Sequence, residues 1–600
     1  MSKKIKTKDY EIKVTPTTKD ETYVLDKKIA TANDTYIQIH PEDISPISMS
    51  IDFAVKEGSK DLVLIGLGYN TDTSTYTKAT TQTIKNYLTY APDNNNLVSY
   101  CSYSDVQKVI NKKIYLATGT VKEELNSQYG GKGSNTYKAI KKYSDGIDHP
   151  SDFFELGGND KYDLLTNMAV QDMSGNDKYT LASEQIYIYE HAGKDSYTFN
   201  NGRTDVKDEK GNDKYTVNKN AIAGIYDYEG KDKYSAKDTE DNEDAYLTIT
   251  DYSGKDSYSF NHATYIRITD GVAPNTYYSE LKPYINKGGN DSYSFVYSTD
   301  FEVVDFSGDD NYKITKCSNK DASLPIIDYY GKDTYTITDS EYTSISDESG
   351  NDKYTVSGSE TLNITLEDEY GDDTYNVTKN AKQVTVTDDS GDDTYKITNG
   401  ANFTNITDKQ GGDTYKLNGT KKNKVENIFV TDNSGDDKYN LSYCDGAQLT
   451  DNSGNDTYTV AKTSNVVLIE DNGGNDTLVL SGAKSKDIIY MSYNNKGNDE
   501  MAKAEAGALF LYNKKLDTFV RIDKFYTISG NTYSGPGNGN IETIKAGSSK
   551  ITAPTADYFT ETINSEVAYW LGQNGYETLS EALYEGAGEN LIQFFQAGNA

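Results

Sequence analysis

The chain of 600 residues combines 35% hydrophobic residues with a formal net charge of −33 and a mean hydropathy of −0.75. This composition suits a globule with one large core poorly, and its acidity argues against nucleic-acid backbones and anionic membrane surfaces as partners. No stretch approaches the roughly 18 apolar residues of a transmembrane segment. Met1–Lys6 lack the apolar region of a cleavable signal peptide. The cysteines Cys101, Cys317 and Cys444 lie too far apart to indicate a disulfide framework or a metal knuckle.

Residues 1–130 are predicted to form a β-rich cap. They and the residues just after them contain degenerate copies of a motif that dominates residues 131–480, as in Asn33–Ile37 and Gly133–Lys138. We therefore interpret this N-terminal region as related in origin to the repeats that follow it.

The motif of residues 131–480 is D-x-x-G-x-D-x-Y-x-ϕ, where ϕ is apolar and the second Asp is called the anchor. It occurs 16 times, always with Gly two residues before the anchor and, in 15 copies, with Tyr two residues after it. The residue five before the anchor, called the upstream acid, is Asp in 13 copies, and Glu155, Glu190 and Asn286 fill the other three. Such self-similarity indicates a stacked, quasi-one-dimensional architecture. The anchors are Asp160, Asp177, Asp195, Asp213, Asp232, Asp256, Asp291, Asp310, Asp333, Asp352, Asp373, Asp393, Asp413, Asp437, Asp456 and Asp476.

One repeat of about 20 residues is too short for a β-helix-β crossover and predicts one coil of a parallel β-solenoid. Thr394–Thr398 and Phe403–Thr407 alternate apolar with polar residues, as strands do, and Asn399–Asn402 has turn chemistry. Strands of successive coils would pair ~4.8 Å apart, so equivalent residues would stack in ladders. Packing of the Tyr ladder inside the coil is expected, with sugar binding by exposed Tyr rings as the alternative.

A ladder of carboxylates at this spacing requires cations. Two unit charges near 5 Å repel by about 3 kcal/mol at an effective dielectric constant of ~20. The motif offers only carboxylate and carbonyl oxygens, which favour a hard cation, and flexible coordination favours Ca²⁺ over Mg²⁺. The alternative is an ordinary acidic turn. The candidate calcium ligands are the sixteen anchors and the upstream acids Asp368, Asp388, Asp408, Asp432, Asp451 and Asp471.

Two segments carry a family resemblance. Asp471–Val479 and Leu156–Tyr162 resemble the nonapeptide of the RTX, or haemolysin-type calcium-binding, family. The first Gly of that nonapeptide is usually Asp here, and this chain has one motif per coil where the family typically has two. The resemblance therefore implies several Ca²⁺ ions along one edge of the coil and an ordinary turn along the other.

The remaining segments are assigned partly by this resemblance. Pro274–Tyr277 is a worn motif copy that would split the gap between anchors 256 and 291 into two coils. Residues 481–552 are predicted to be a closing β module of the kind that follows RTX repeats, because Lys486–Ser492 and Val520–Tyr526 echo segments near residues 60 and 83.

The last segment, 553–600, is predicted to contain helices over Asp557–Gly572 and Thr578–Gln596. It resembles the uncleaved C-terminal signal of type I secretion substrates. A helical cap on the open end of the solenoid is the alternative, and one segment could serve both purposes.

No zinc-protease helix, nucleophile elbow, phosphate loop or dinucleotide turn is present, so catalysis is not expected. The sequence predicts a secreted, extracellular calcium-binding protein with a structural or adhesive role. Its expected partners are calcium, the type I secretion apparatus, and an extracellular polysaccharide or cell surface. The alternative is an extracellular enzyme, carbohydrate-active or another hydrolase, with its site on the solenoid face or in residues 1–130.

Overall fold

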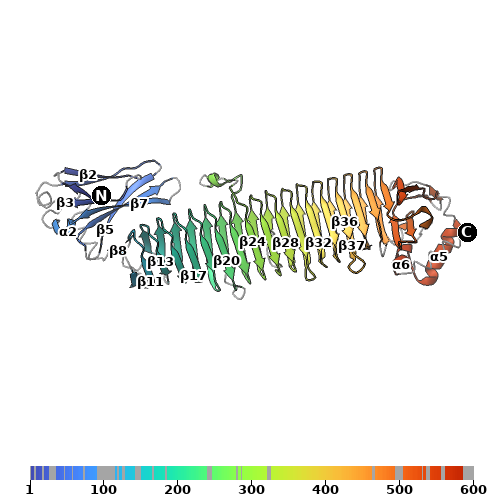
Figure 1. The fold of residues 1–600 in the computed structure, drawn as a ribbon, viewed down its shortest axis with the longest axis horizontal. Helices are drawn as coiled ribbons and strands as arrows, with labels where there is room; N and C mark the ends of the chain where they lie inside the picture. The colour runs from blue at the N-terminus through green and yellow to red at the C-terminus, as the bar shows by residue number, and fades with distance from the viewer. Residues whose placement is uncertain are drawn as a thin grey trace. The chain divides into compact units, whose positions relative to one another are not determined.

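A computed structural model of the chain confirms the predicted fold class, a parallel β-solenoid of about 19 coils (Figure 1). The chain divides into two compact units, residues 1–292 with 303–307 and residues 293–302 with 308–600. The structure describes residues 2–90, 115–141 and 151–585, apart from short internal segments, of which the longest are 26–35, 240–245, 320–325, 493–504, 535–540 and 556–560.

One coil of the second unit shows how the repeat folds. The strand β34 (Thr394–Thr398) follows the anchor Asp393, and a short turn leads into β35 (Asn402–Asp408). The next anchor, Asp413, then precedes β36 (Thr414–Asn418), which pairs in parallel with β34 and places Tyr395 beside Tyr415. Strands that follow an anchor form one sheet, here called the motif sheet. Strands that end at an upstream acid form the other, the return sheet.

The first unit contains seven motif strands and the return strands that alternate with them. Its motif sheet comprises β11 (Thr136–Lys141), β13 (Lys161–Leu164), β15 (Lys178–Ala182), the start of β17 (Ser196–Asp208), β18 (Lys214–Val217), β20 (Lys233–Lys237) and β22 (Ser257–Asn261). Its return sheet comprises β12 (Ser151–Glu155), β14 (Met168–Asp172), β16 (Ile186–Glu190), the end of β17, β19 (Ala221–Asp227), β21 (Leu247–Asp251) and β23 (Thr264–Asp270).

The second unit repeats this alternation, and the division between the units falls within β24 (Ser292–Val296) and β25 (Thr299–Asp305). Its further motif strands are β26 (Asn311–Thr315), β28 (Thr334–Thr338), β30 (Lys353–Ser357), β32 (Thr374–Thr378), β34, β36, β38 (Lys438–Ser442), β41 (Thr457–Val460) and β43 (Thr477–Leu480). Its return strands are β27 (Ile326–Asp328), β29 (Glu341–Asp347), β31 (Leu362–Asp368), β33 (Lys382–Asp388), β35, β37 (Val425–Asp432), the short β39 (Cys444–Asp445), β40 (Gln448–Asp451) and β42 (Val466–Asp471).

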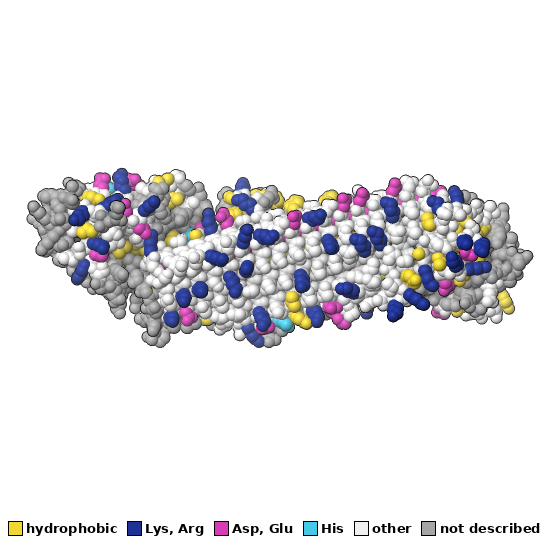
Figure 2. Space-filling view, in the orientation of Figure 1, with side chains coloured by type: hydrophobic (Ala, Val, Ile, Leu, Met, Phe, Trp, Pro, Cys, Tyr) yellow, Lys and Arg dark blue, Asp and Glu magenta, His cyan; other side chains and the backbone are white. Residues whose placement is uncertain are grey.

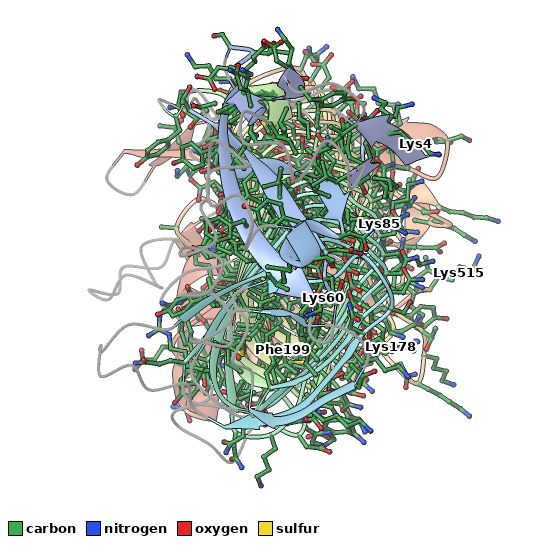
Figure 3. All side chains as sticks on the ribbon, turned by 90° about the vertical axis from the view of Figure 1, so that its left-hand side faces the viewer. Lys4, Lys60, Lys85, Lys178, Phe199 and Lys515 are labelled. Carbon is green, nitrogen blue, oxygen red and sulfur yellow. The ribbon has the colours of Figure 1, made fainter. Side chains whose placement is uncertain are left out.

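The core lies between the two sheets, and its main component is the Tyr ladder. Tyr375, Tyr395 and Tyr415 are fully buried, as predicted. Their ring centroids are 5.0 and 4.8 Å apart, and the rings are tilted by only 6° and 5°. Figure 3 shows the same division in the first unit, where Phe199 lies between the sheets and Lys178 points outward. The ladder is therefore core packing, which decides against exposed Tyr rings as a sugar-binding column.

The segment before the repeats is β-rich. Its parallel strands β1 (Ser2–Ile5), β3 (Glu21–Leu25) and β7 (Thr75–Lys85) continue into an antiparallel meander of β7, β6 (Leu62–Asn70) and β5 (Ile47–Lys56). A core that includes Ile5, Leu25, Leu64 and Ile84 holds these strands together. The remaining elements are β2 (Asp9–Val14), β4 (Tyr36–Pro41), α2 (Tyr87–Tyr90), β8 (Tyr115–Ala117), β9 (Thr120–Glu124) and β10 (Tyr129–Gly130).

The closing segment is also a three-stranded antiparallel meander, β44 (Ile488–Met491), β45 (Leu509–Asn513) and β46 (Thr518–Ile522), joined in parallel to β42 through β46. The predicted echo between the two ends holds only in part. The Lys-Asp segment leads into β6, which pairs directly with β7, but its counterpart leads into β44, which is separated from β46 by β45. The other elements are η3 (Ser485–Asp487), β47 (Thr527–Ser529), β48 (Thr532–Ser534), β49 (Thr543–Ala546) and β50 (Ser549–Ile551).

The C-terminal helices are shorter than the sequence predicts. They are α5 (Glu561–Asn574) and α6 (Leu579–Tyr584), and the part of the second predicted helix beyond Glu585, with Phe594 and Phe595, lies outside the described residues. The side chain of Thr578 caps α6 by accepting a hydrogen bond from the backbone N–H of Glu581 at 3.0 Å. Both helices pack on the closing meander through the buried residues Val567, Leu571, Leu579, Ala582 and Leu583. The tail thus covers this end of the solenoid.

The predicted coil at Pro274–Tyr277 is wrong. The backbone N–H of Asp256 donates directly to the carboxylate of Asp291, and Ser292 N donates to Asp256 O at 3.1 Å, so the two anchors lie in adjacent coils. Residues 271–290 are an insertion that contains η2 (Lys282–Tyr284) and protrudes from the strands as the green loop in Figure 1. Its Tyr284 packs against Tyr228, with ring centroids 5.7 Å apart.

Candidate metal centres

Each coil places two acids at one edge of the solenoid, called the motif edge. The upstream acid is the last residue of a return strand, and the anchor comes five residues later in most coils, just before the next motif strand. In the coil of β33 and β34 these are Asp388 and Asp393, which are 0% and 1% exposed. The structure buries both columns of acids, unlike the ordinary acidic turn that was the alternative to a metal site.

Most upstream carboxylates have hydrogen-bond donors for both oxygens, although one oxygen each of Glu190, Asp227, Asp328 and Asp368 is buried without a donor. In Asp388, Oδ1 accepts from the backbone N–H of Ser390 at 3.1 Å, and Oδ2 accepts from the hydroxyl of Tyr375 at 2.7 Å. The next coil repeats this arrangement, with Tyr395 donating to Asp408 at 2.6 Å. The Tyr ladder therefore positions the upstream acids as well as forming the core.

The anchors link successive coils. The backbone N–H of Asp373 donates to Oδ1 of Asp393 at 2.5 Å, and that of Asp393 donates to Oδ1 of Asp413 at 2.6 Å. The other oxygen, Oδ2, is buried and has no hydrogen-bond partner in most anchors. These are Asp160, Asp177, Asp195, Asp213, Asp232, Asp256, Asp333, Asp352, Asp373, Asp393, Asp413, Asp437, Asp456 and Asp476. A buried carboxylate oxygen without a donor is costly, so its repetition requires an explanation.

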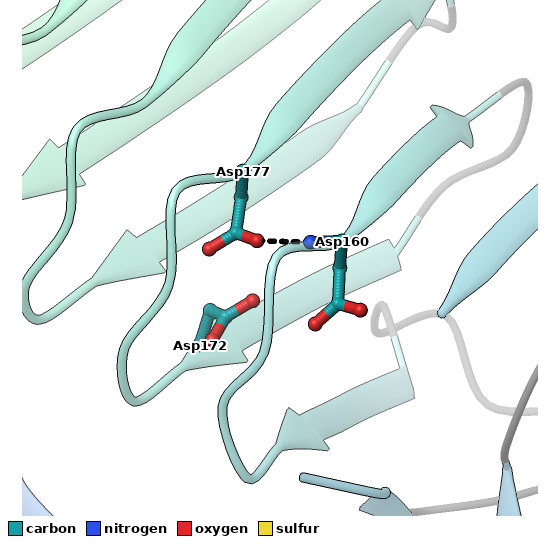
Figure 4. Close-up of side chains that lie close together, drawn as sticks. All are labelled: Asp160, Asp172 and Asp177. Carbon is teal, nitrogen blue, oxygen red and sulfur yellow. Dashed lines mark hydrogen bonds between the residues drawn. The ribbon is translucent and has the colours of Figure 1, made fainter. Parts of the chain in front are cut away.

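The fold brings three carboxylates together between neighbouring coils. Asp160, Asp172 and Asp177, drawn in Figure 4, each offer an oxygen within 4.8 Å of the others, and all three are buried. Each triad consists of one anchor, the following upstream acid and the next anchor. The described residues contain four more such triads up to Asp256 and ten further groups of the same kind.

These carboxyl groups are difficult to ionise without a cation. Burial, together with the charges of neighbouring Asp residues, raises the pKa of Asp393 to about 9 and that of Asp413 to about 8. The pKa of Asp172 is also well above its usual range, first because of burial and then because of Asp177. At neutral pH the triads must therefore hold either protons or a positive ion.

The residues present fit a hard cation. Every donor in the triads is a carboxylate oxygen, and the turn adds a column of glycine carbonyls. A Cβ at Gly391 would lie 1.5 Å from the carbonyl oxygen of Gly371, so only glycine permits the coils to approach this closely at the motif edge. All-oxygen sites with several carboxylates are those that Ca²⁺ prefers.

The ladder of anchors ends on different residues at each terminus. Its first acceptor, Asp160, receives the backbone N–H of Asn135, whose side chain in turn donates to the carbonyls of Gly131 and Gly133 at 2.8 and 2.6 Å. At the other end Asp476 N donates to Oε2 of Glu542, 2.6 Å away, from the closing module. Glu542 thus takes the position that the next anchor would occupy.

All twenty-two predicted ligands lie at the motif edge and are buried. The structure adds further upstream acids, whose spacing of five residues before an anchor was the available signal: Glu155, Asp172, Glu190, Asp208, Asp227, Asp251, Asp305, Asp328 and Asp347. Asp270 gave no such signal, because the insertion separates it from its anchor. It accepts from Tyr258 at 2.6 Å and takes the place in the column that spacing assigned to Asn286.

No family profile, curated protein sequence or solved structure matches this chain significantly. Among the described residues, no helix has the length and apolar character needed to cross a membrane. The functional argument therefore depends on the chemistry of the motif edge.

Proposed function

We propose that this chain is a secreted calcium-binding repeat protein with a structural or adhesive role, whose solenoid orders when Ca²⁺ fills the motif edge. Two observations at the anchors carry the proposal: their buried Oδ2 lacks a donor, and each anchor carboxylate offers an oxygen within 4.8 Å of two other carboxylates in one triad after another. Ca²⁺ would supply the missing positive partner there.

The overall charge supports this proposal. The formal net charge is −33, and fifteen divalent cations, one for each carboxylate group, would supply 30 positive charges. Without them the buried columns repel, and the repulsion must be relieved by protonation or unfolding. Calcium binding and folding would therefore be one process, as in other proteins whose sites exist only in the folded state.

Calcium titration with Tb³⁺ as a probe tests the proposal. The Tyr hydroxyls bond directly to the upstream acids, so light absorbed by the Tyr ladder should sensitise bound Tb³⁺, and Ca²⁺ should displace it. We expect β-sheet circular dichroism to appear with Ca²⁺ at roughly 10⁻⁴–10⁻³ M, as for extracellular modules. Mg²⁺ should not replace Ca²⁺. A spectrum at pH 8 that chelator leaves unchanged would contradict the proposal.

Export by a type I apparatus is the further part of the proposal, and it rests on the family resemblance and on the helical tail. Because α5 and α6 pack on the closing meander, deleting them would disturb folding as well as any signal. The sharper experiment fuses residues 553–600 to a passenger in a bacterium with a type I system. We expect the passenger in the supernatant, and its retention in the cells would refute the signal and leave only the cap.

A further inference from the structure

The first unit carries a regular row of lysines along its motif edge, called the Lys row. Every coil from anchor 160 to anchor 256 has a lysine directly before or directly after the anchor, and all of them are exposed. The row consists of Lys161, Lys178, Lys194, Lys214, Lys231, Lys233 and Lys255. Each of the six coils contributes at least one lysine, and successive coils are spaced ~4.8 Å apart, as paired strands are. In Figure 2, the face formed by the motif sheet shows lysines among uncharged side chains, with carboxylates gathered mainly along its borders.

These lysines are not required by the buried acids. None of the seven forms an ion pair within the described part of the chain, whereas nearby Lys210 pairs with Glu229 at 3.7 Å. Lys194 lowers the pKa of Asp213, but this influence is the smallest on that carboxyl and burial dominates. In the second unit the same buried ladder exists with Asp372, Asp392 and Asp436 at the position before the anchor.

A lysine directly before the anchor also costs the fold a hydrogen bond between neighbouring coils. Asp392 N donates to Oδ1 of Asp372 at 3.0 Å, and Asn176 N donates to Oδ1 of Asn159 at 3.0 Å, so an Asp or Asn before the anchor joins two coils. Lysine has no acceptor atom and cannot take this role. Lys194 and Lys231 therefore replace a stabilising contact with an exposed, unpaired charge, which points to a partner outside the chain.

A second row lies directly beside the Lys row on the outer face of the motif sheet. It consists of hydroxyl side chains that are stacked in register by the parallel pairing of β15, β17, β18, β20 and β22, namely Thr180, Thr198, Thr216, Ser235 and Ser259. The surface thus offers charges at a fixed axial spacing next to hydrogen-bonding hydroxyls. A linear polymer with a regular negative charge and many hydroxyl groups complements both rows.

We propose that the Lys row and the hydroxyl row bind an acidic polysaccharide that runs along the solenoid axis. This inference deepens the proposed adhesive role, and it depends on calcium because an unfilled motif edge would repel a polyanion. The net acidity of the chain does not oppose this binding, because the acids of the motif are buried and the lysines of the row are exposed.

The surface fits nucleic acid and membranes less well. The exposed aromatic side chains of the described first unit lie on return strands or in the insertion, as Tyr189, Tyr226, Tyr265 and Tyr278 do. The motif-sheet face therefore provides no stacking platform for bases and no apolar anchor for a bilayer. Its basic residues are all lysine, without the arginine fork that suits phosphate.

The test uses the full chain loaded with Ca²⁺ and fluorescent dextran sulfate, whose binding is followed by anisotropy at several salt concentrations. The variant K178Q/K194Q/K214Q/K233Q should weaken binding at least about 10-fold and reduce the dependence of log Kd on log salt. The matched control, K313Q/K379Q/K396Q/K416Q, removes four lysines of the second unit that do not flank an anchor and should weaken binding less than about 2-fold.

Neutral dextran should bind neither protein. Equal weakening in the variant and the control, or none in either, would overturn the proposal. Tighter binding of oligo(dT) or of phosphatidylserine vesicles than of dextran sulfate, abolished by the same variant, would overturn the polysaccharide assignment. Circular dichroism and calcium stoichiometry are recorded for each protein. Loss of calcium binding in the wild type would contradict the proposed function, whereas loss of dextran sulfate binding alone would contradict only this inference.

Discussion

The two edges of a coil follow different rules. At the motif edge, four residues separate the upstream acid from the anchor in the regular coils, and both acids are buried. At the opposite edge, where a motif strand turns into a return strand, the connection has three residues after β34 but six after β36. Left-handed residues such as Asn380 and Asn399, with φ of 64° and 51°, make these turns. A fixed length is therefore required only where hydrogen bonds and carboxylates join one coil to the next.

The largest expected effect is that of calcium removal, because only one of the two edges of a coil is expected to bind the ion. If only the motif edge binds Ca²⁺, the loaded protein should contain about one ion for each of the fifteen carboxylate groups. Chelation at pH 8 should then remove most of the β-sheet signal, since every pair of coils loses its cation. Native mass spectrometry gives the count. A value near two ions per coil would show that the opposite edge also binds.

The pH dependence of folding stability without metal tests whether the charge of the buried acids at the motif edge opposes folding. The folded pKa of Asp393 is about 9, above its unfolded value of 3.8, so protonation stabilises the fold fully below about pH 4 and this stability is lost as the pH rises through 9. In chelator the chain should be folded at pH 5 and unfolded at pH 8. Thermal unfolding followed by circular dichroism checks this. A chelated chain that is more stable at pH 8 than at pH 5 would contradict it.

The core between the edges should respond strongly to truncation. Tyr395→Ala leaves a cavity in a fully buried stack and removes the donor to Asp408, so we expect a loss of about 3–5 kcal/mol in the free energy of unfolding. Tyr395→Phe keeps the ring and should cost about 1–3 kcal/mol, because Asp408 loses one hydrogen bond. Denaturation in saturating Ca²⁺ measures both. Equal losses would show that the hydroxyl and not the ring carries the stability.

Substituting one residue at each edge of the same coil compares how much the two edges contribute to stability and calcium binding. Asp393→Ala leaves the backbone N–H of Asp373 without its acceptor and should cost about 1–3 kcal/mol, and it should weaken calcium binding in the two triads that share this anchor. Asn399→Gly, in the left-handed turn of the same coil, should change stability by less than about 1 kcal/mol. A variant of Asn399 that lost calcium would break the distinction between the edges.

Shortening the opposite edge should have the smallest effect. Replacing the six residues 419–424 by the three-residue turn Asn-Gly-Ala of the preceding coil should leave calcium binding unchanged. The midpoint of thermal unfolding in Ca²⁺ should shift by only a few degrees. Removing one residue from 389–392 is the matched change at the motif edge, and it should abolish binding in that coil.

Much of this arrangement could be predicted from the sequence because the repeat is redundant. The alternation of polar and apolar residues in Thr394–Thr398 predicted the strand and its inward-facing Tyr. Its register with the neighbouring strand could also be predicted, since the same pattern recurs in the next coil. The burial of Asp393 could not be predicted, because isolated acids favour solvent and only the neighbouring coil supplies the N–H that its carboxylate accepts. The position of Asp270 was also hidden, since an insertion removed the spacing that identifies its equivalents.

The ladder of anchors has a direction and two terminators, Asn135 and Glu542. Within each unit, an internal coil accepts a hydrogen bond from the coil before it and donates one to the coil after it, so these coils have the same two joints. Segments bounded by equivalent positions, such as 374–393, are therefore interchangeable parts. Genes for such a protein can gain or lose whole coils by duplication and unequal recombination without any compensating change elsewhere. The length of the solenoid is thus open to selection independently of its fold.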